Sequence, residues 1–264
     1  KFVKMKITLF TSNQSRHNYL INKLSKISSE LFVVQENDTL FPGEVPGHYP
    51  ASDQYKNYFA NVLAAQKKLF KENYISTKNI RLLPLMEGDV NKCSLDLLSD
   101  FLKSDIYIVT GSSFIKGDLA KFLIKKNALS IHMGVAPYYR GTDCNFWALF
   151  DNNPHLVGAT IYKLSEGLDT GQILYHALSE IKDDPFIYTM SVVKSAFDSL
   201  VEKIKNNTIL DISTLAQDKN NEIRYSRKKD FNNEIIEEFN QKKINLNSKK
   251  FDHSLFKSPF ILRE

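Results

Sequence analysis

His132 and Asp169 are the residues whose surroundings suggest chemistry most directly. His132 ends an apolar run, and Asp169 lies in a turn between Gly167 and Gly171. An imidazole can take a proton from an attacking nucleophile, and a nearby carboxylate can orient the ring and favour its charged form. The two glycines allow a tight turn that lets the main chain approach a flat ligand. The pair is therefore a candidate for acid–base catalysis, although a structural histidine and a turn-forming aspartate would look the same.

Other catalytic signatures are missing from the sequence. It contains no Gly-x-Ser-x-Gly elbow, no P-loop, no Gly-x-Gly-x-x-Gly and no His-Glu-x-x-His. No metal is expected, because His132 and Asp169 supply too few ligands locally. Cys93 and Cys144 lie too far apart to form a metal-type pair, and free thiols without an export signal predict a cytoplasmic protein. No apolar run approaches the roughly 20 residues that span a bilayer, so no membrane partner is expected.

The first half of the chain alternates apolar, β-rich runs with helical periodicity. This pattern predicts right-handed βαβ units in an open, mostly parallel α/β sheet. The predicted strands are 3–10, 31–34, 80–85, 106–110 and 128–132, and the predicted helices are 16–27, 52–73, 94–102 and 116–126. Ligands bind beyond the carboxyl ends of such strands, which draws attention to the loops 11–16, 111–115 and 132–141.

The second half begins with a hairpin. Residues 156–164 and 173–178 are predicted strands, and Asp184 with Pro185 opens a helix. Beyond residue 206 the chain is rich in Asn and Lys, with a short helix predicted at 232–241. We therefore expect a domain over 1–205 and a short carboxyl-terminal appendage over 206–264.

Segment 130–174 resembles the core of the formyltransferases that use 10-formyltetrahydrofolate. That family includes glycinamide ribonucleotide, methionyl-tRNA and nucleotide-sugar formyltransferases. Its pattern is Asn-x-His, then a Pro-containing loop with Arg-Gly, then Gly-x-x-Asp-x-Gly. The corresponding segments here are Ser130-Ile131-His132, Pro137 with Arg140-Gly141, and Gly167-Leu168-Asp169-Thr170-Gly171. The chain is most like the nucleotide-sugar members, and the resemblance implies a Rossmann-like fold of the formyltransferase type.

The resemblance also implies roles for individual residues. The acceptor amine attacks the formyl carbon of the folate donor, giving a tetrahedral oxyanion. His132 would accept the proton or stabilise the oxyanion, and Asp169 would orient His132 and relay protons. The pterin pocket would be lined by Ser112, Ser113, Phe114, Ile115 and the main chain at Leu168.

Ser130 departs from the family, which has Asn at this position. A serine hydroxyl donates from a shorter side chain, and loss of one oxyanion donor typically costs about 10²–10³ in rate. Three explanations stay open: a subfamily that uses Ser, a substitution that traps a complex, or a weakened enzyme. Asn145 could take over the role of the missing amide.

The acceptor is indicated by weaker signals. Asn13 and Arg16, in a loop before a helix, suit a phosphate, and Arg140 would also contact substrate. Tyr225 and Arg227 resemble residues that approach the nucleotide in nucleotide-sugar formyltransferases. A plain strand–helix connector and a solvated basic strand are the alternatives for these two segments.

A nucleotide-linked amino sugar is the leading acceptor. The basic excess in 219–264 could attract nucleic acid, but its interleaved acids favour a solvated surface. The tail is too short for a tRNA-binding barrel, so no nucleic-acid partner is expected. A catalytically impaired folate- or nucleotide-binding protein, and a formyltransferase acting on another phosphorylated amine, are the alternative functions. Whether the chain forms a homodimer stays open.

Overall fold

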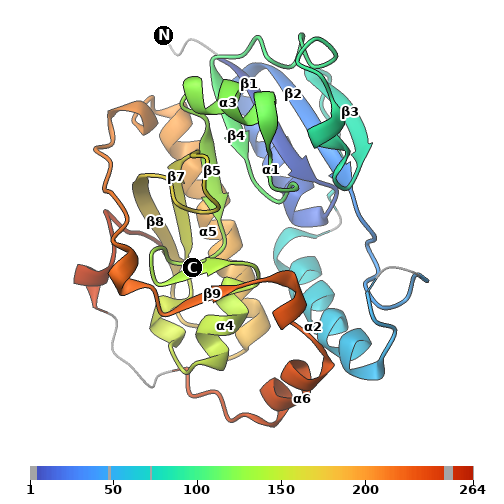
Figure 1. Cartoon of the computed structure of the whole chain (residues 1–264), viewed down its shortest axis with the longest axis vertical. Helices are drawn as coiled ribbons and strands as arrows, with labels where there is room; N and C mark the ends of the chain where they lie inside the picture. The colour runs from blue at the N-terminus through green and yellow to red at the C-terminus, as the bar shows by residue number, and fades with distance from the viewer. Residues whose placement is uncertain (1–4, 47–48, 72, 247–251, 264) are drawn as a thin grey trace.

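The computed structural model describes residues 5–46, 49–71, 73–246 and 252–263, and its central layer is an eight-stranded sheet (Figure 1). The strand order is β10-β8-β7-β5-β4-β1-β2-β3. The parallel part consists of β1 (Met5–Ser12), β2 (Ser28–Asn37), β3 (Ile80–Met86), β4 (Ile106–Val109) and β5 (Leu129–His132). β7 (Ala159–Lys163) is antiparallel to β5 and to β8 (Ile173–Ser179), and β10 (Phe260–Leu262) pairs in parallel with β8. The predicted α/β class with a mostly parallel sheet is confirmed.

Helices cover both faces of this sheet, because alternate strand residues point to opposite sides. Ile7 and Leu9 of β1 belong to the core under α1 (Ser15–Ile27) and α5 (Pro185–Lys205). Phe10 and Val109 belong to the opposite core, under α3 (Gly117–Lys125). The remaining helices are α2 (Asp53–Phe70), α4 (Cys144–Phe150) and α6 (Asn233–Gln241).

The two longest helices each begin directly after a residue whose side chain caps the helix. The Ser52 hydroxyl accepts the N–H of Tyr55 at 3.2 Å and so begins α2. The Asp184 carboxylate accepts the N–H groups of Phe186 and Ile187 at 2.8 and 2.9 Å, directly before α5. These bonds satisfy amide groups that have no partner inside the helix. The predicted starts of both helices are confirmed.

Three local predictions need correction. Segment 94–102 forms consecutive turns rather than a helix, and of its leucines only Leu98 is buried, so the segment has no continuous apolar face packed on the core. The helix predicted from 16 begins at Ser15, and its cap is Gln14, whose side chain makes no capping bond. The strand predicted at 31–34 extends over Ser28–Asn37. Residues 3 and 4 of the first predicted strand lie outside the described residues.

Residues beyond 206 return to the body of the molecule. β9 (Arg224–Ser226) pairs in parallel with β6 (Tyr139–Gly141), and α6 packs against α2. A Cβ on Gly141, whose φ is 96°, would collide with the Ser226 carbonyl, so this pairing requires the glycine of the Arg-Gly motif. The division into 1–205 and 206–264 stays a prediction. Within the described ranges, no helix combines the length and apolarity needed to cross a membrane.

Candidate active site

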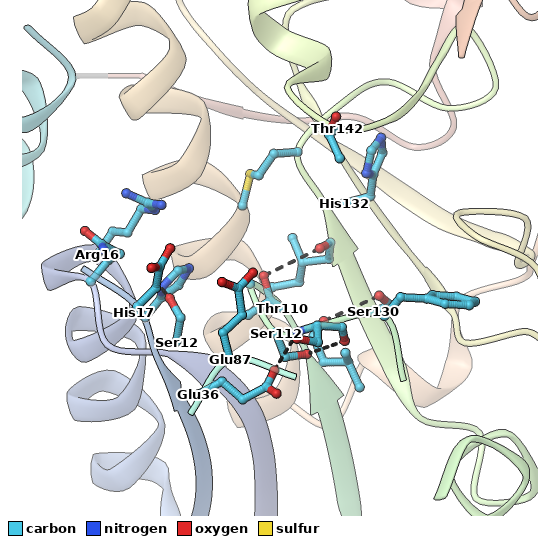
Figure 2. Close-up of a pocket in the computed structure, with 18 of the residues that line it drawn as sticks. Ser12, Arg16, His17, Glu36, Glu87, Thr110, Ser112, Ser130, His132 and Thr142 are labelled. Atoms are coloured by element: carbon cyan, nitrogen blue, oxygen red, sulfur yellow. Dashed lines mark hydrogen bonds between the residues drawn. The ribbon is translucent and has the colours of Figure 1, made fainter. Parts of the chain in front are cut away.

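A cavity of about 590 Å³ lies at the carboxyl ends of the parallel strands (Figure 2). Ser12 reaches it from β1, Glu36 from β2, Thr110 from directly after β4 and His132 from β5. Parallel strands end at one edge of the sheet, so residues far apart in sequence meet there. In Figure 2, Arg16 and His132 lie on opposite sides of this space.

His132 and Asp169 form a close, buried pair. His132 Nδ1 lies 3.4 Å from Asp169 Oδ2, and the two side chains are 8% and 9% exposed. His132 Nε2 lies 3.1 Å from the carbonyl oxygen of Tyr139. Nε2 is thus within hydrogen-bonding distance of a carbonyl oxygen, and Nδ1 lies at ion-pair distance from a carboxylate. This geometry suits the imidazolium that forms when a histidine accepts a proton.

Asp169 is fixed by further bonds to both carboxylate oxygens. The Tyr162 hydroxyl donates to Oδ1 at 3.0 Å, and the Gly141 N–H donates to Oδ2 at 3.2 Å. Gln217 Nε2 donates to the Asp169 carbonyl at 2.8 Å. Burial, together with the nearby Asp169 charge, raises the pKa of Tyr162 above its usual value, which keeps its proton available for donation. Sequence reasoning missed Tyr162, although it lies on the strand predicted directly before the Asp169 turn.

Ser130 lies on β5 with Tyr162 as its cross-strand partner, and it lines the main cavity. Its hydroxyl donates to the Val109 carbonyl at 3.4 Å, which is long for such a bond. Asn145 does not line this cavity, and its Oδ1 accepts the N–H of Gly158 at 2.9 Å. Asn145 lines a second, adjoining cavity instead.

The predicted folate residues share the main cavity with this pair. It is lined by Ser112, Ser113, Phe114, Ile115 and Leu168. The loop carrying the first four is held by Glu36, which is 2% exposed and was missed in the sequence. Glu36 accepts the N–H of Ser113 at 2.6 Å, and those of Gly88 and Val90 at 2.8 and 3.3 Å. Its position just beyond the predicted strand 31–34 was the sequence feature that could have identified this acidic residue.

Arg16 and His17 bring polar groups from the start of α1. Arg16 lines the main cavity and donates to Gln66 Oε1 at 2.6 Å. Burial lowers the pKa of Arg16 to about 10, so it stays cationic at neutral pH. Burial, and then the charge of Arg16, lower the pKa of His17 well below its ordinary value. His17 packs so closely on Gly111, whose φ is 69°, that a Cβ there would lie 2.5 Å from its Nε2.

The other predicted substrate residues lie outside the cavities described here. The Asn13 amide donates to the Asp38 carbonyl at 2.9 Å, which joins two loops. The Arg140 guanidinium bonds to Glu222 at 2.7 Å and to the Leu168 carbonyl at 2.9 Å. Arg140 thus supports the main chain at Leu168 without lining the cavity itself. Contact of Asn13 and Arg140 with substrate stays a prediction.

Tyr225 and Arg227 lie on and just after β9. The Tyr225 ring, which is 42% exposed, lies 5.7 Å from the Arg140 guanidinium and 5.9 Å from that of Arg227. Neither residue lines the main cavity or the second one. Their contact with a nucleotide stays a prediction.

A second cavity, of about 300 Å³, adjoins the first at His132. Both are lined by Arg16, Phe59, Val62, His132, Met133 and Gly141. The remaining walls of the second cavity come mostly from helices, so the histidine can be approached from two sides.

Comparison with known proteins places this geometry in a family context. No protein-family model matches the chain. It is 34% identical over 96 residues to a methionyl-tRNA formyltransferase of Caldicellulosiruptor saccharolyticus, an alignment covering 36% of this chain and 30% of that protein. The chain spans about a third of the length of the curated relatives it matches.

Solved structures share the fold at low sequence identity. A sugar N-formyltransferase from Shewanella sp. has a TM-score of 0.53 and 14% identity, with coverage of 86% of this chain and 78% of that one. A glycinamide ribonucleotide transformylase from Symbiobacterium toebii has a TM-score of 0.53 and 12% identity, covering 81% and 95%. The chain therefore has the formyltransferase fold, and the resemblance to formyltransferases indicated by its motifs is confirmed.

Proposed function

We propose that this protein is an N-formyltransferase that moves a formyl group from 10-formyltetrahydrofolate to the primary amine of a small acceptor. The observation that carries the proposal is the pairing of His132 with Asp169 beside the loop 111–115 in one cavity. The sequence similarity to methionyl-tRNA formyltransferases and the shared fold support it.

The residues of the main cavity fit a folate donor. A volume of about 590 Å³ lies within the range of cofactor sites, which are mostly apolar with a few placed polar groups. Phe114 and Ile115 offer apolar surface, while the loop main chain and Leu168 offer hydrogen-bonding groups. The bound donor would supply a formyl carbon open to attack by an amine.

His132 is then the proton acceptor. As the amine nitrogen bonds to the formyl carbon it must lose a proton, and His132 takes it at Nε2, where the amine would replace the Tyr139 carbonyl as the neighbour of this nitrogen. Asp169 stabilises the resulting imidazolium across 3.4 Å, and Tyr162 and Gly141 hold Asp169 in place. The proton then passes to the departing folate nitrogen, which returns His132 to its starting state.

For the acceptor we propose an amino sugar, carried on a nucleotide. Support comes from the fold shared with a sugar N-formyltransferase and from Arg16, a cation that lines both cavities. Another phosphorylated amine is the alternative substrate. The cytoplasmic location stays a prediction.

Ser130 favours a second candidate, a folate- or nucleotide-binding protein with little activity, because its hydroxyl faces a main-chain carbonyl. The test is formyl transfer from 10-formyltetrahydrofolate to free and nucleotide-linked amino sugars, by the wild type and Ser130→Asn. We expect turnover by the wild type. A large gain with Asn would identify an impaired enzyme, and folate binding without transfer in either form would overturn the proposed function.

A further inference from the structure

The turn that carries Asp169 is held by side chains from outside the turn. The φ of Asp169 is 51°, in the left-handed region that an L-residue adopts only at a cost in free energy. On one side of the turn, Arg140 donates to the Leu168 carbonyl at 2.9 Å. On the other side, Gln217 Nε2 donates to the carbonyls of Asp169 and Gly171 at 2.8 and 2.7 Å. Two residues distant in sequence thus hold three main-chain carbonyls of one short turn.

The NH₂ group of Gln217 matches the two carbonyls that it faces. An amide nitrogen has two N–H donors, and here both acceptors belong to the same turn. In the reversed orientation the amide oxygen would face two carbonyl oxygens, so the bonding itself assigns the nitrogen. Within the part of the chain that the structure describes, the Gln217 Oε1 atom is buried and accepts no hydrogen bond. Because burial of an unpaired oxygen is unfavourable, Gln217 contributes through its NH₂ group.

Gln217 lies in the carboxyl-terminal stretch between α5 and β9, which is drawn in orange in Figure 1. Two residues before it, Leu215 exchanges two backbone hydrogen bonds with Ile173 of β8, each 2.8 Å long. After it, the Ile223 N–H donates to the Tyr138 carbonyl at 2.8 Å. The stretch is attached to the body of the molecule on both sides of Gln217, so the amide reaches the Asp169 turn from a fixed base.

The position of this turn sets the separation of the catalytic pair. Asp169 Oδ2 lies 3.4 Å from His132 Nδ1, which is longer than an ordinary hydrogen bond. The main chain that carries Asp169 therefore has to set this separation. Stabilisation of an imidazolium by a carboxylate weakens as their distance grows. Displacement of a catalytic group by about 1 Å can lower the rate about 10²-fold.

We propose that Gln217 is a positioning residue of the catalytic pair. Its NH₂ group holds the carbonyls of Asp169 and Gly171, and so keeps the Asp169 carboxylate where it stabilises the His132 imidazolium. Gln217 lines neither cavity, so it acts through Asp169 rather than on a reactant. This inference rests on the proposed function for its reaction and on the contacts of the turn for the role of Gln217.

Two variants remove the donors. Gln217→Met keeps the length of the side chain, and Gln217→Glu keeps its shape but is charged and donates no bond at pH 8. In each, kcat for formyl transfer should fall about ten- to a hundredfold, while the KM values for donor and acceptor change little. The pH dependence of kcat should also shift, which a general loss of stability would not produce. Wild-type kcat at pH 8 in both variants would overturn the inference.

The controls change the same carboxyl-terminal stretch or the same residue type. Thr214→Val removes a bond to Gln172 Oε1 without touching the Asp169 turn. Gln241→Met replaces an exposed glutamine at the end of α6. Both should keep the wild-type kcat. Thermal unfolding of each variant shows whether it has folded, and Gln217→Glu still tests the inference if Gln217→Met has not.

The Gly141 amide gives a measurement that needs no turnover, because it donates to Asp169 Oδ2 at 3.2 Å. Arg-Gly occurs once in the sequence, at Arg140-Gly141. Labelling with ¹³C-carbonyl arginine and ¹⁵N-glycine therefore isolates this one peptide bond in an NMR spectrum. In the Gln217 variants the Gly141 amide proton should move to lower chemical shift and exchange faster with water. An unchanged signal in folded Gln217→Met and Gln217→Glu would contradict the inference.

The two measurements separate this inference from the proposed function. If the wild type transfers no formyl group but the Gly141 signal moves as expected, Gln217 holds Asp169 and the proposed reaction fails. If the wild type transfers the formyl group and the Gln217 variants change neither kcat nor the Gly141 signal, the enzyme assignment stands and this inference fails.

Discussion

The two cavities that meet at His132 are made of different kinds of segment. The main cavity is formed by short connections at the ends of parallel strands, where polar side chains are tied to main-chain groups, as Glu36 is to Ser113. The second is lined mainly by residues of the helices α1, α2, α4, α5 and α6, and its aromatic rings pack on one another. The two cavities therefore offer a ligand different surfaces: placed hydrogen-bonding groups in the main cavity and a largely apolar wall in the second. Each prediction below changes one part of this arrangement.

The largest effect is expected for Asp169→Asn. An amide cannot stabilise the imidazolium, so kcat should fall about 10³–10⁴-fold, the scale seen when a histidine loses its carboxylate partner. Binding of the folate and of the acceptor should change little. The measurement is kcat beside folate and acceptor titrations, with Glu166→Gln, an exposed acid in the same turn, as control. Normal turnover in Asp169→Asn would remove the pair from the mechanism.

A second prediction concerns the loop shared by the cavities, whose Ala136 carbonyl lies 2.9 Å from His176 Nε2. His176 Nδ1 accepts the Lys257 N–H at 2.8 Å, so the neutral ring satisfies both neighbours. Burial, only partly opposed by the bond to the Ala136 carbonyl, lowers the pKa of His176 from 6.5 to about 4. Below pH 6.5 the unfolded chain therefore binds more protons than the folded chain. The free energy of unfolding falls as the pH drops toward 4, by up to about 3 kcal/mol.

Urea unfolding at pH 8, 6 and 5 measures this loss of stability. His176→Gln keeps a donor and an acceptor but does not titrate, so its stability should depend less steeply on pH. Some dependence should remain, because the pKa of His17 is also lowered. An equally steep dependence in His176→Gln would show that His176 is not responsible.

Tyr162→Phe removes the hydroxyl that bonds to Asp169 and leaves the ring. A hydrogen bond to a charged group contributes about 1.5–3 kcal/mol, so kcat should fall about ten- to a hundredfold. The pH dependence of kcat should also shift, which loss of packing alone would not produce. Tyr107→Phe, a buried tyrosine in the opposite core, is the control. An unchanged rate and pH profile would exclude a positioning role for Tyr162.

The smallest effect, about tenfold, is expected for Glu36→Gln. The NH₂ group of the glutamine must then face a backbone N–H group. Because both groups are donors, a hydrogen bond is lost and the loop 111–115 is held less firmly. The KM for the formyl donor should rise, while kcat and acceptor binding stay near wild type. Steady-state kinetics compare it with Glu44→Gln, an exposed acid. An equal rise in the KM for the acceptor would contradict a role of Glu36 confined to the loop 111–115.

The two cavities also differ in how much of each could be predicted from the sequence. His132, Asp169 and the loop 111–115 were assigned together because motifs record local sequence and strand ends converge. The second cavity was not predicted, since its walls combine residues from five helices that are far apart in the chain. Apolar, β-rich runs predicted most strands, but the predicted run stopped short in β2, where Gln35 and Glu36 are buried and hydrogen-bonded although they are polar.

Contacts between residues far apart in the chain explain most of the other differences between the predicted and the observed positions. Arg140 was expected to contact substrate, but it bonds to Glu222. Glu222 directly precedes the segment that pairs with β6, and no local sequence pattern predicted that pairing. Tyr225 and Arg227 were placed by resemblance alone, and their position outside both cavities depends on that same pairing. Segment 94–102 has helical spacing in part, but its leucines lack a common buried face.

The most direct test of the central claim is single-turnover formyl transfer by the wild type and His132→Ala, with folate binding titrated in the same preparations. The account predicts a loss of about 10²–10⁴-fold in the chemical step with folate affinity retained, because the imidazole accepts the proton but does not line the pocket alone. Transfer at the wild-type rate by His132→Ala would contradict it.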